Sequence, residues 1–112
     1  MGKIVTSPVE HFAGTVTISD PLNMVQTLGW EKAVRTAREM TEPIYITDLN
    51  AVYLPAVLAC VEAWNLTGIP PSPTVDTFPF SPRLLTAQLM DWLIGEILKV
   101  YAGEITEAEK ND

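Results

Sequence analysis

The sequence is poor in the side chains that most often build chemical sites. Its 112 residues include one cysteine and one histidine. A disulfide within the chain needs a second cysteine, so Cys60 indicates a reducing compartment or a thiol that serves as a small apolar side chain. No Cys or His lies near His11 in sequence, which excludes a local zinc motif and favours a solvent-exposed histidine. Glycine-rich phosphate loops and dinucleotide-binding fingerprints are also absent.

Acidic pairs are present, but none has the spacing of a known acid–base or metal motif. Asp91 with Glu96, and Glu104 with Glu107, fit solvated helix faces instead. We therefore expect a protein that is not an enzyme, with no catalytic residues, no cofactor and no metal.

Positive charge is scarce as well. Seven Lys and Arg residues stand against fourteen Asp and Glu residues, which gives a net charge of −7 at pH 7. Binding to a nucleic-acid backbone or to an anionic membrane surface needs clustered Lys and Arg, so we expect neither partner. The longest apolar run, residues 51–61, is too short for a bilayer span of about twenty residues. The first residues also lack the apolar core of a signal peptide, which predicts a cytoplasmic protein.

What is present indicates one folded domain. The hydrophobic fraction is 47% and the charged fraction 19%, as in globular proteins rather than disordered chains. A chain of this size buries roughly two thirds of the surface that it exposes when unfolded. We expect a single globular domain over residues 1–104. Residues 105–112 lack an apolar face and are expected to form an acidic flexible tail.

Three segments have the pattern of helices: residues 20–40, 48–66 and 81–102. Apolar side chains recur at helical spacing in the first and the third. Asp20 is predicted to cap the first helix, with Pro21 at the first helical position, where a missing N–H costs little.

The other helix ends follow the same reasoning. Asp48 is expected to cap the second helix and Ser81 the third, and Gly103 is expected to end the third. Residues 51–61 are apolar all round, which predicts a buried central helix. Pro55 lies just beyond the first turn, where it either kinks the helix or marks its true start.

The N-terminal part has a different period. In residues 3–19 the stretch "TVTIS" alternates, with Val16 and Ile18 on one face, which predicts a small hairpin or two short strands. We therefore predict a mainly α, α+β fold: a three-helix core, a small N-terminal β-hairpin or short strands, and a long proline-rich loop before the last helix.

The proline-rich loop is the most unusual stretch. Residues 69–83, "IPPSPTVDTFPFSPR", hold five of the nine prolines and two of the three phenylalanines. A long connection of this kind either packs Phe78 and Phe80 onto the helices or presents an extended edge to another protein. The sequence leaves both interpretations of this loop open.

One tryptophan falls in each predicted helix. Trp30, Trp64 and Trp92 fit core anchors where helices cross, but one of them half exposed on a partner face is an alternative. Trp64 is the candidate for exposure because it lies at a helix end beside the proline segment. The predicted partner-binding residues are therefore Trp64, Phe78 and Phe80.

The order of these pieces resembles the small tail assembly chaperones of long-tailed, siphovirus-like bacteriophages. The matching pieces are "SPVEHFAGTVTISDPL", "GWEKAVRTARE" and "CVEAWNLTGIPPSPTVDTFPFSPR", followed by an amphipathic helix and an acidic end. The resemblance runs over nearly the full chain and includes no catalytic or metal signature. Phe80 stands where we expect a small residue in such a protein.

The resemblance implies a mostly helical protein in the cytoplasm of a host bacterium. Such a protein binds the tape-measure protein and keeps this long helical chain soluble while tail tube subunits assemble around it. The tail tube protein is a second expected partner, and self-association along the client is a natural extension. Surplus apolar residues and a net charge of −7 are compatible with this role.

Two other classes of protein fit the same size and charge. One is a structural tail-completion or connector protein, which would be found in purified virions. The other is a small acidic inhibitor of a host defence protein, although the acidic residues are not arrayed along one face.

Overall fold

The computed structural model describes residues 2–69 and 83–110. Its described part forms three helices, three strands and one short 3-10 turn, so the predicted mainly helical α+β class is confirmed. The elements in chain order are β1 (Gly2–Thr6), the 3-10 turn (Glu10–Phe12), β2 (Thr15–Ser19), α1 (Met24–Glu39), α2 (Ile46–Cys60), β3 (Val61–Trp64) and α3 (Arg83–Lys110). The predicted proline-rich loop lies outside the described residues.

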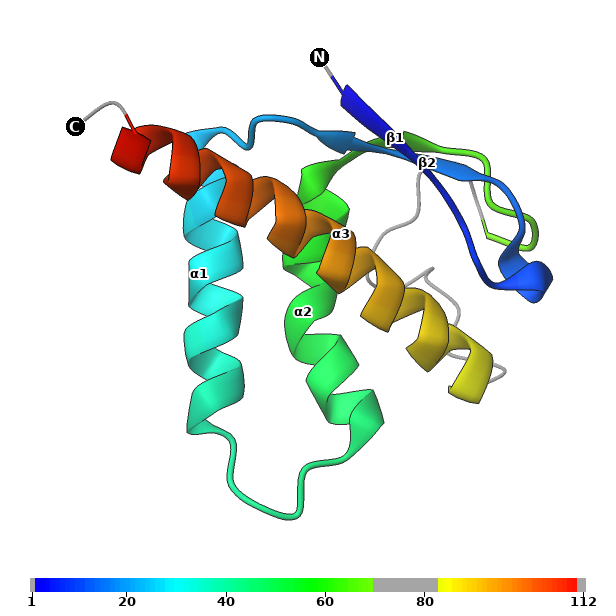
Figure 1. The fold of residues 1–112 in the computed structure, drawn as a ribbon. Coiled ribbons are helices and arrows are strands. Elements are labelled where there is room, and N and C mark those ends of the chain that lie inside the picture. Colours follow the sequence, from blue (N-terminus) through cyan, green and yellow to red (C-terminus); the bar gives the residue numbers. More distant parts are fainter. Residues whose placement is uncertain (1, 70–82, 111–112) are drawn as a thin grey trace.

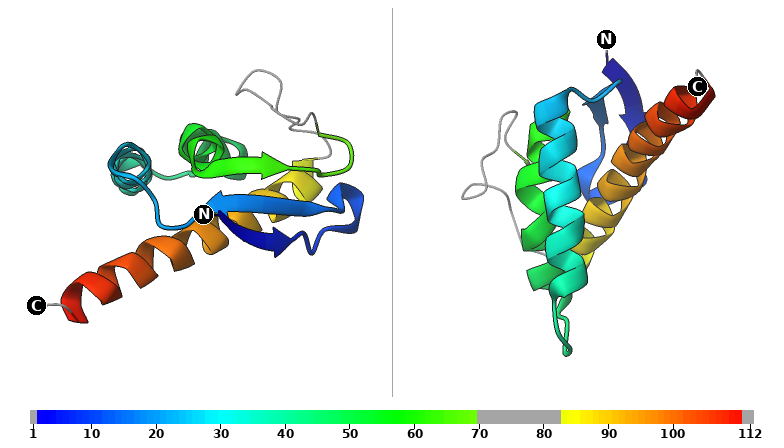
Figure 2. Two further views of the ribbon diagram at one scale, coloured as in Figure 1. Left: turned by 90° about the horizontal axis from the view of Figure 1, so that it is seen from above. Right: turned by 90° about the vertical axis from the view of Figure 1, so that its left-hand side faces the viewer.

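The helices and the sheet share one core. α1 and α2 run antiparallel side by side, and α3 crosses the same side of this pair and of the sheet (Figures 1 and 2). Five fully buried side chains belong to one hydrophobic cluster: Val16 and Ile18 of β2, and Leu89, Leu93 and Ile97 of α3. One side of the α1–α2 pair is therefore covered by α3, and no helix or strand of residues 2–69 and 83–110 covers the opposite side.

The sheet is antiparallel, with β2 between β1 and β3. The predicted N-terminal hairpin is confirmed, with Val5 opposite Val16. The third strand was not predicted, because Val61–Trp64 had been assigned to the helix of residues 48–66. The helix ends at Cys60 because the second edge of β2 offers long-range hydrogen bonds, and Trp64 pairs opposite Val16 in this ladder.

A close contact holds the residue that follows β3 against the start of β2. The Oδ1 atom of Asn65 accepts hydrogen bonds from the backbone N–H of Thr15 at 2.7 Å and from its hydroxyl at 3.2 Å. Gly14 has a φ of +141°, and a Cβ at this position would run into the carbonyl oxygen of Asn65. Only glycine combines this backbone conformation with so close an approach.

The start of α1 differs from the prediction. Asn23, not Asp20, caps the helix, and its Oδ1 accepts from the N–H of Gln26 at 2.8 Å. The Gln26 side chain in turn accepts from the N–H of Asn23 at 2.8 Å. This reciprocal capping box outcompetes Asp20 because it satisfies two backbone donors, and the buried Leu22 occupies the core just before it.

α2 also starts earlier than predicted. Its N-cap is Tyr45, which provides no side-chain hydrogen bond, and Asp48 lies inside the first turn, where a negative charge favours the positive end of the helix dipole. Pro55 lies within the helix. The predicted all-round burial is wrong, since Leu54 and Val57 are fully buried but Ala51, Pro55 and Ala59 are exposed on one side.

α3 is longer than predicted. It continues past Gly103 to Lys110 and so includes residues 105–110 of the segment that was expected to be a tail. The prediction that Gly103 ends the helix is wrong because the residues after it are mostly good helix formers such as Glu, Ala and Lys. Ser81, the predicted cap of this helix, lies outside the described residues.

Candidate functional site

The tryptophans are not placed as the partner-binding prediction requires. Trp30 is 2% exposed and Trp64 is 7% exposed, whereas Trp92 is only partly buried. The alternative that Trp64 is exposed is wrong, because this residue belongs to β3 and joins the core cluster with Val16. Phe78 and Phe80 lie outside the described residues, so their role stays a prediction.

Exposed apolar side chains gather instead around α1. Eight large hydrophobic residues of the described chain are strongly exposed, and five of them belong to α1 or to its connection with α2: Met24, Val25, Leu28, Ile44 and Tyr45. Only Trp30 and Ala33 of α1 are buried. Single exposed apolar residues are ordinary, but Met24, Val25 and Leu28 all lie in the first two turns of α1 and indicate a contact surface.

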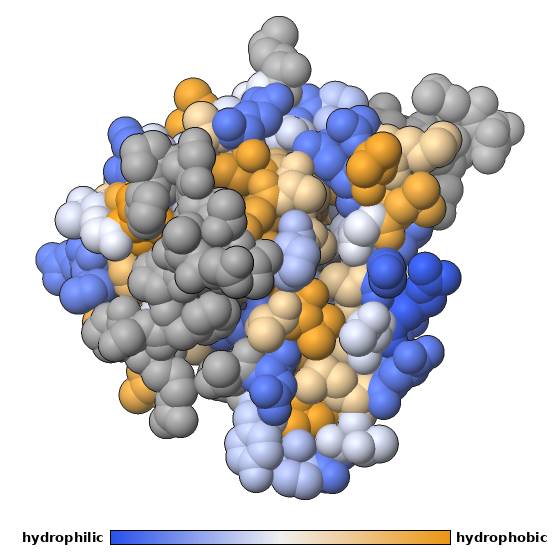
Figure 3. Space-filling model, turned by 180° about the vertical axis from the view of Figure 1, so that it is seen from behind, coloured by the Kyte–Doolittle hydropathy of each residue, from blue (hydrophilic) through white to orange (hydrophobic). Residues whose placement is uncertain are grey.

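The side of α1 that faces α2 opens into an apolar groove, which we call the α1–α2 groove. Its volume is about 390 Å³. It is lined on α1 by Val25, Gly29, Lys32, Ala33 and Thr36, and on α2 by Val52, Pro55, Ala56 and Ala59. Figure 3, which views the molecule from the side opposite α3, shows apolar side chains gathered over these two helices.

Small residues keep this groove open. A Cβ added at Gly29 would meet no atom within 4 Å, so the position has free space above it. On α2, the small side chains of Ala56 and Ala59 line the groove. The Nε2 atom of Gln26 donates to the carbonyl oxygen of Ala59 and to the hydroxyl of Ser19, both at 2.9 Å. One end of the groove is therefore fixed by hydrogen bonds to α2 and to β2.

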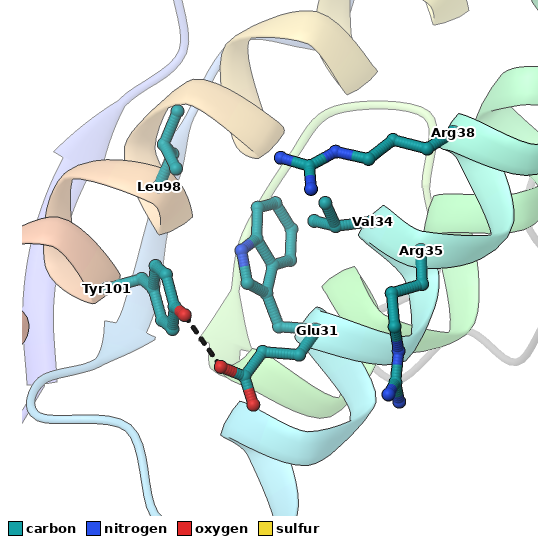
Figure 4. A pocket seen from close by; sticks show the side chains of 7 residues that line it. Glu31, Val34, Arg35, Arg38, Leu98 and Tyr101 are labelled. Carbon is teal, nitrogen blue, oxygen red and sulfur yellow. Dashed lines mark hydrogen bonds between the residues drawn. The ribbon is translucent and has the colours of Figure 1, made fainter.

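The opposite side of α1 faces α3 and forms a second hollow, which we call the α1–α3 pocket. It has a volume of about 420 Å³. Its lining residues are Trp30, Glu31, Val34, Arg35, Arg38, Leu98 and Tyr101. In Figure 4 the Tyr101 hydroxyl points at Glu31, and it donates a hydrogen bond of 2.7 Å to the Glu31 carboxylate. Arg38 extends toward α3, whereas Arg35 points away from the space between the helices.

The titratable groups of the described chain favour structural roles. Burial raises the pKa of the Cys60 thiol to about 11, which keeps it protonated and a poor nucleophile at neutral pH. Burial also raises the pKa of Glu96, but hydrogen bonds and charges from Lys99 and Lys3 outweigh it and hold that pKa below its ordinary value. His11 is exposed, as expected, and meets the Phe12 ring edge-on.

Within residues 2–69 and 83–110, no three His, Cys, Asp or Glu side chains lie close enough together to hold a metal ion. None of the helices there combines the length and the apolar character that crossing a membrane requires.

Neither of the two surfaces on α1 was predicted from the sequence. Val25 and Leu28 fitted the apolar stripe of a core-facing helix, yet they are 77% and 57% exposed. The signal for the groove in the sequence was Gly29, a residue that weakens a helix and yet lies in the middle of α1. Comparisons of the chain with protein-family models, with curated proteins and with solved structures find no match.

Proposed function

We propose that this protein is a non-catalytic tail assembly chaperone that holds an apolar helical segment of its client in the α1–α2 groove. The observation that carries the proposal is the groove itself, an open apolar channel between two helices with Val25 exposed beside Gly29. An amphipathic client helix buries its apolar face in a channel of this kind. The small residues on the two walls allow close approach of its backbone.

The client is the tape-measure protein of a long-tailed phage, as the resemblance of the sequence implies. Such a chain is long, helical and rich in apolar surface that must stay covered before the tail tube encloses it. The net charge of −7 supports the same role, because like-charged complexes repel one another and stay in solution. The host cytoplasm is the compartment in which this work takes place.

The first experiment is co-expression with the long helical tail protein that we expect to be encoded beside this one. The fraction of client in the soluble phase and its co-purification with the chaperone are measured. The wild-type chain is expected to keep the client soluble. Insoluble client both with and without the chain would reject the chaperone role, and recovery of the chain from purified virions would favour a structural tail protein.

Two matched variants locate the binding surface. Gly29→Lys places a charged side chain in the open space of the groove, and Gly95→Lys makes the same change on α3. Both replace a glycine in a helix by a better helix former, so both are expected to stabilise the fold by up to about 1 kcal/mol. Only Gly29→Lys is expected to abolish client solubilisation. Equal activity of the two variants would exclude the groove as the contact.

A further inference from the structure

We propose that the α1–α3 pocket binds the acidic end of a second copy of this chain. The pocket holds two of the seven basic residues of this acidic protein. Arg35 and Arg38 lie about one turn apart on α1 and both line it. In the described part of the chain the ion pairs join Glu96 to Lys3 and Lys99, and neither arginine pairs with a described carboxylate.

The pocket combines this charge with an apolar interior. Val34 and Leu98 line it, and Leu98 is 49% exposed. Trp30 lines it too, and its Nε1 is buried without a hydrogen-bond partner among the described residues. The one carboxylate in the lining, Glu31, is already engaged by the Tyr101 hydroxyl. An occupant that suits this lining brings one apolar side chain with carboxylates beside it.

The end of this chain has that composition. Residues 103–112, "GEITEAEKND", carry four carboxylate side chains, a single lysine and one large apolar residue, Ile105. Ile105 matches the apolar interior. Glu109, one turn further along the same face of the helix, and the adjacent Glu104 match the guanidinium groups. An arginine pairs with a carboxylate through two parallel hydrogen bonds, which gives both attraction and orientation.

The occupant comes from a second copy because the chain cannot fold this segment back onto its own pocket. α3 supplies Leu98 and Tyr101 to the pocket and then continues as helix to Lys110. At about 1.5 Å of rise per residue, the helix carries its last turns about 13 Å beyond Tyr101. The C-terminal end of α3 projects past α1 in both views (Figures 1 and 2).

This contact is heterologous, since the pocket of one copy receives the end of the next. Such a contact leaves a pocket free at one end and an acidic segment free at the other, so association can continue copy by copy. It goes beyond the proposed function and does not depend on a client.

The test is sedimentation velocity of the full-length chain over a range of concentrations, without client. Average size is expected to grow with concentration at low ionic strength and to fall as added salt screens the charges, whose reach is about 10 Å at 0.1 M salt. Arg38→Ala is expected to weaken association about tenfold or more, since this side chain extends over the pocket. Arg35→Ala is expected to weaken it less, and Lys32→Ala, which changes a charge on the groove side of α1, less than about twofold.

A charge-reversal pair identifies the occupant. One variant carries Arg35→Glu and Arg38→Glu, and the other carries Glu104→Lys and Glu109→Lys. Each alone is expected to stay monomeric, and an equimolar mixture is expected to associate again. A wild-type chain that stays monomeric at every concentration and low salt overturns the proposal. So does a mixture that stays monomeric, which would leave the pocket to another acidic partner. Client solubilisation is scored separately, so failure of this contact and failure of the chaperone role give different results.

Discussion

The two sides of α1 differ in chemistry although they belong to the same sixteen residues. The side toward α2 is an open groove of small and apolar residues, and the side toward α3 is a pocket with two arginines and a hydrogen-bonded carboxylate. Only Trp30 and Ala33 are buried, so most of the helix surface is available for contacts. A helix held along one narrow line can therefore offer two separate binding surfaces, at the cost of contributing little to the core.

Trp30 is the residue on which both surfaces depend, and its truncation is expected to have the largest effect. It is 2% exposed and its ring lies 5.5 Å from that of Tyr53 on α2. Trp30→Ala is expected to lower the free energy of unfolding by about 3–5 kcal/mol and to disable groove and pocket together. Urea unfolding measures the first effect.

Trp30→Phe is the matched control for this truncation. It keeps most of the ring volume and breaks no hydrogen bond to a described residue, because Nε1 has no partner there. Its expected loss is about 1.5 kcal/mol or less. Equal losses for the two variants would contradict the view that ring packing holds α1 in place.

Tyr101→Phe changes the α1–α3 pocket and leaves the lining of the α1–α2 groove unchanged. It removes the hydroxyl that donates to Glu31 and so a direct hydrogen bond between α3 and α1. A hydrogen bond to a charged group contributes about 1.5–3 kcal/mol, and partial exposure places the expected loss at the low end. Thermal or urea unfolding measures the loss. Client solubilisation is expected to stay unchanged, and its loss would show that the two surfaces are coupled.

Gly29→Ala changes the α1–α2 groove and leaves the lining of the α1–α3 pocket unchanged. The position has open space and an ordinary helical backbone, so alanine is expected to stabilise the fold by about 0.5–1 kcal/mol. Gly95→Ala is expected to give a similar gain. Gly14→Ala is the contrasting control, because positive φ and the nearby Asn65 carbonyl make it destabilising. A stability loss in Gly29→Ala would show that the groove is closed in solution.

The smallest expected effect concerns Glu96, which joins α3 to β1 through Lys3 at 3.4 Å and pairs with Lys99 at 3.2 Å. Its pKa is held below the ordinary 4.5, so the folded state binds this proton less readily than the unfolded state. The stabilisation is complete above the unfolded pKa and is lost as pH falls through the folded pKa. Both lysines are partly or largely exposed, so it amounts to about 1 kcal/mol or less.

Comparison of Glu96→Gln with the wild type checks this effect. Unfolding free energies are measured between pH 7 and about pH 3, where exposed carboxylates titrate. The difference between the two proteins is expected to shrink as the pH falls. A constant difference would mean that the charge of Glu96 contributes nothing to stability.

Local patterns predicted the hairpin and the three helices, because the alternation and the helical spacing of apolar residues can be seen among residues that are close in sequence. They failed where distant residues decide. The segment Val61–Trp64 continues an apolar run and looks helical by itself, and only pairing with β2 makes it a strand. Asp20 and Asn23 are both good caps, and the partner Gln26 decides between them.

The candidate site was harder to predict for a related reason. An apolar pattern tells which side of a helix avoids water but not whether another element covers it. Val25 and Leu28 satisfy the pattern and remain exposed because α2 contacts α1 along Trp30 and Ala33 instead. The arginines of the pocket lie near Leu98 and Tyr101 only because of where α3 crosses α1, which no local pattern in the sequence predicts.

The direct passage from α2 into β3 has a mechanical consequence. Cys60 is the last residue of the helix and Val61 the first of the strand, so no loop lies between them to absorb rotation. Gln26 anchors this same point through Ala59 and Ser19. Separation of α2 from α1 at this end therefore also displaces β3, and the hydrogen bonds between β2 and β3 oppose it.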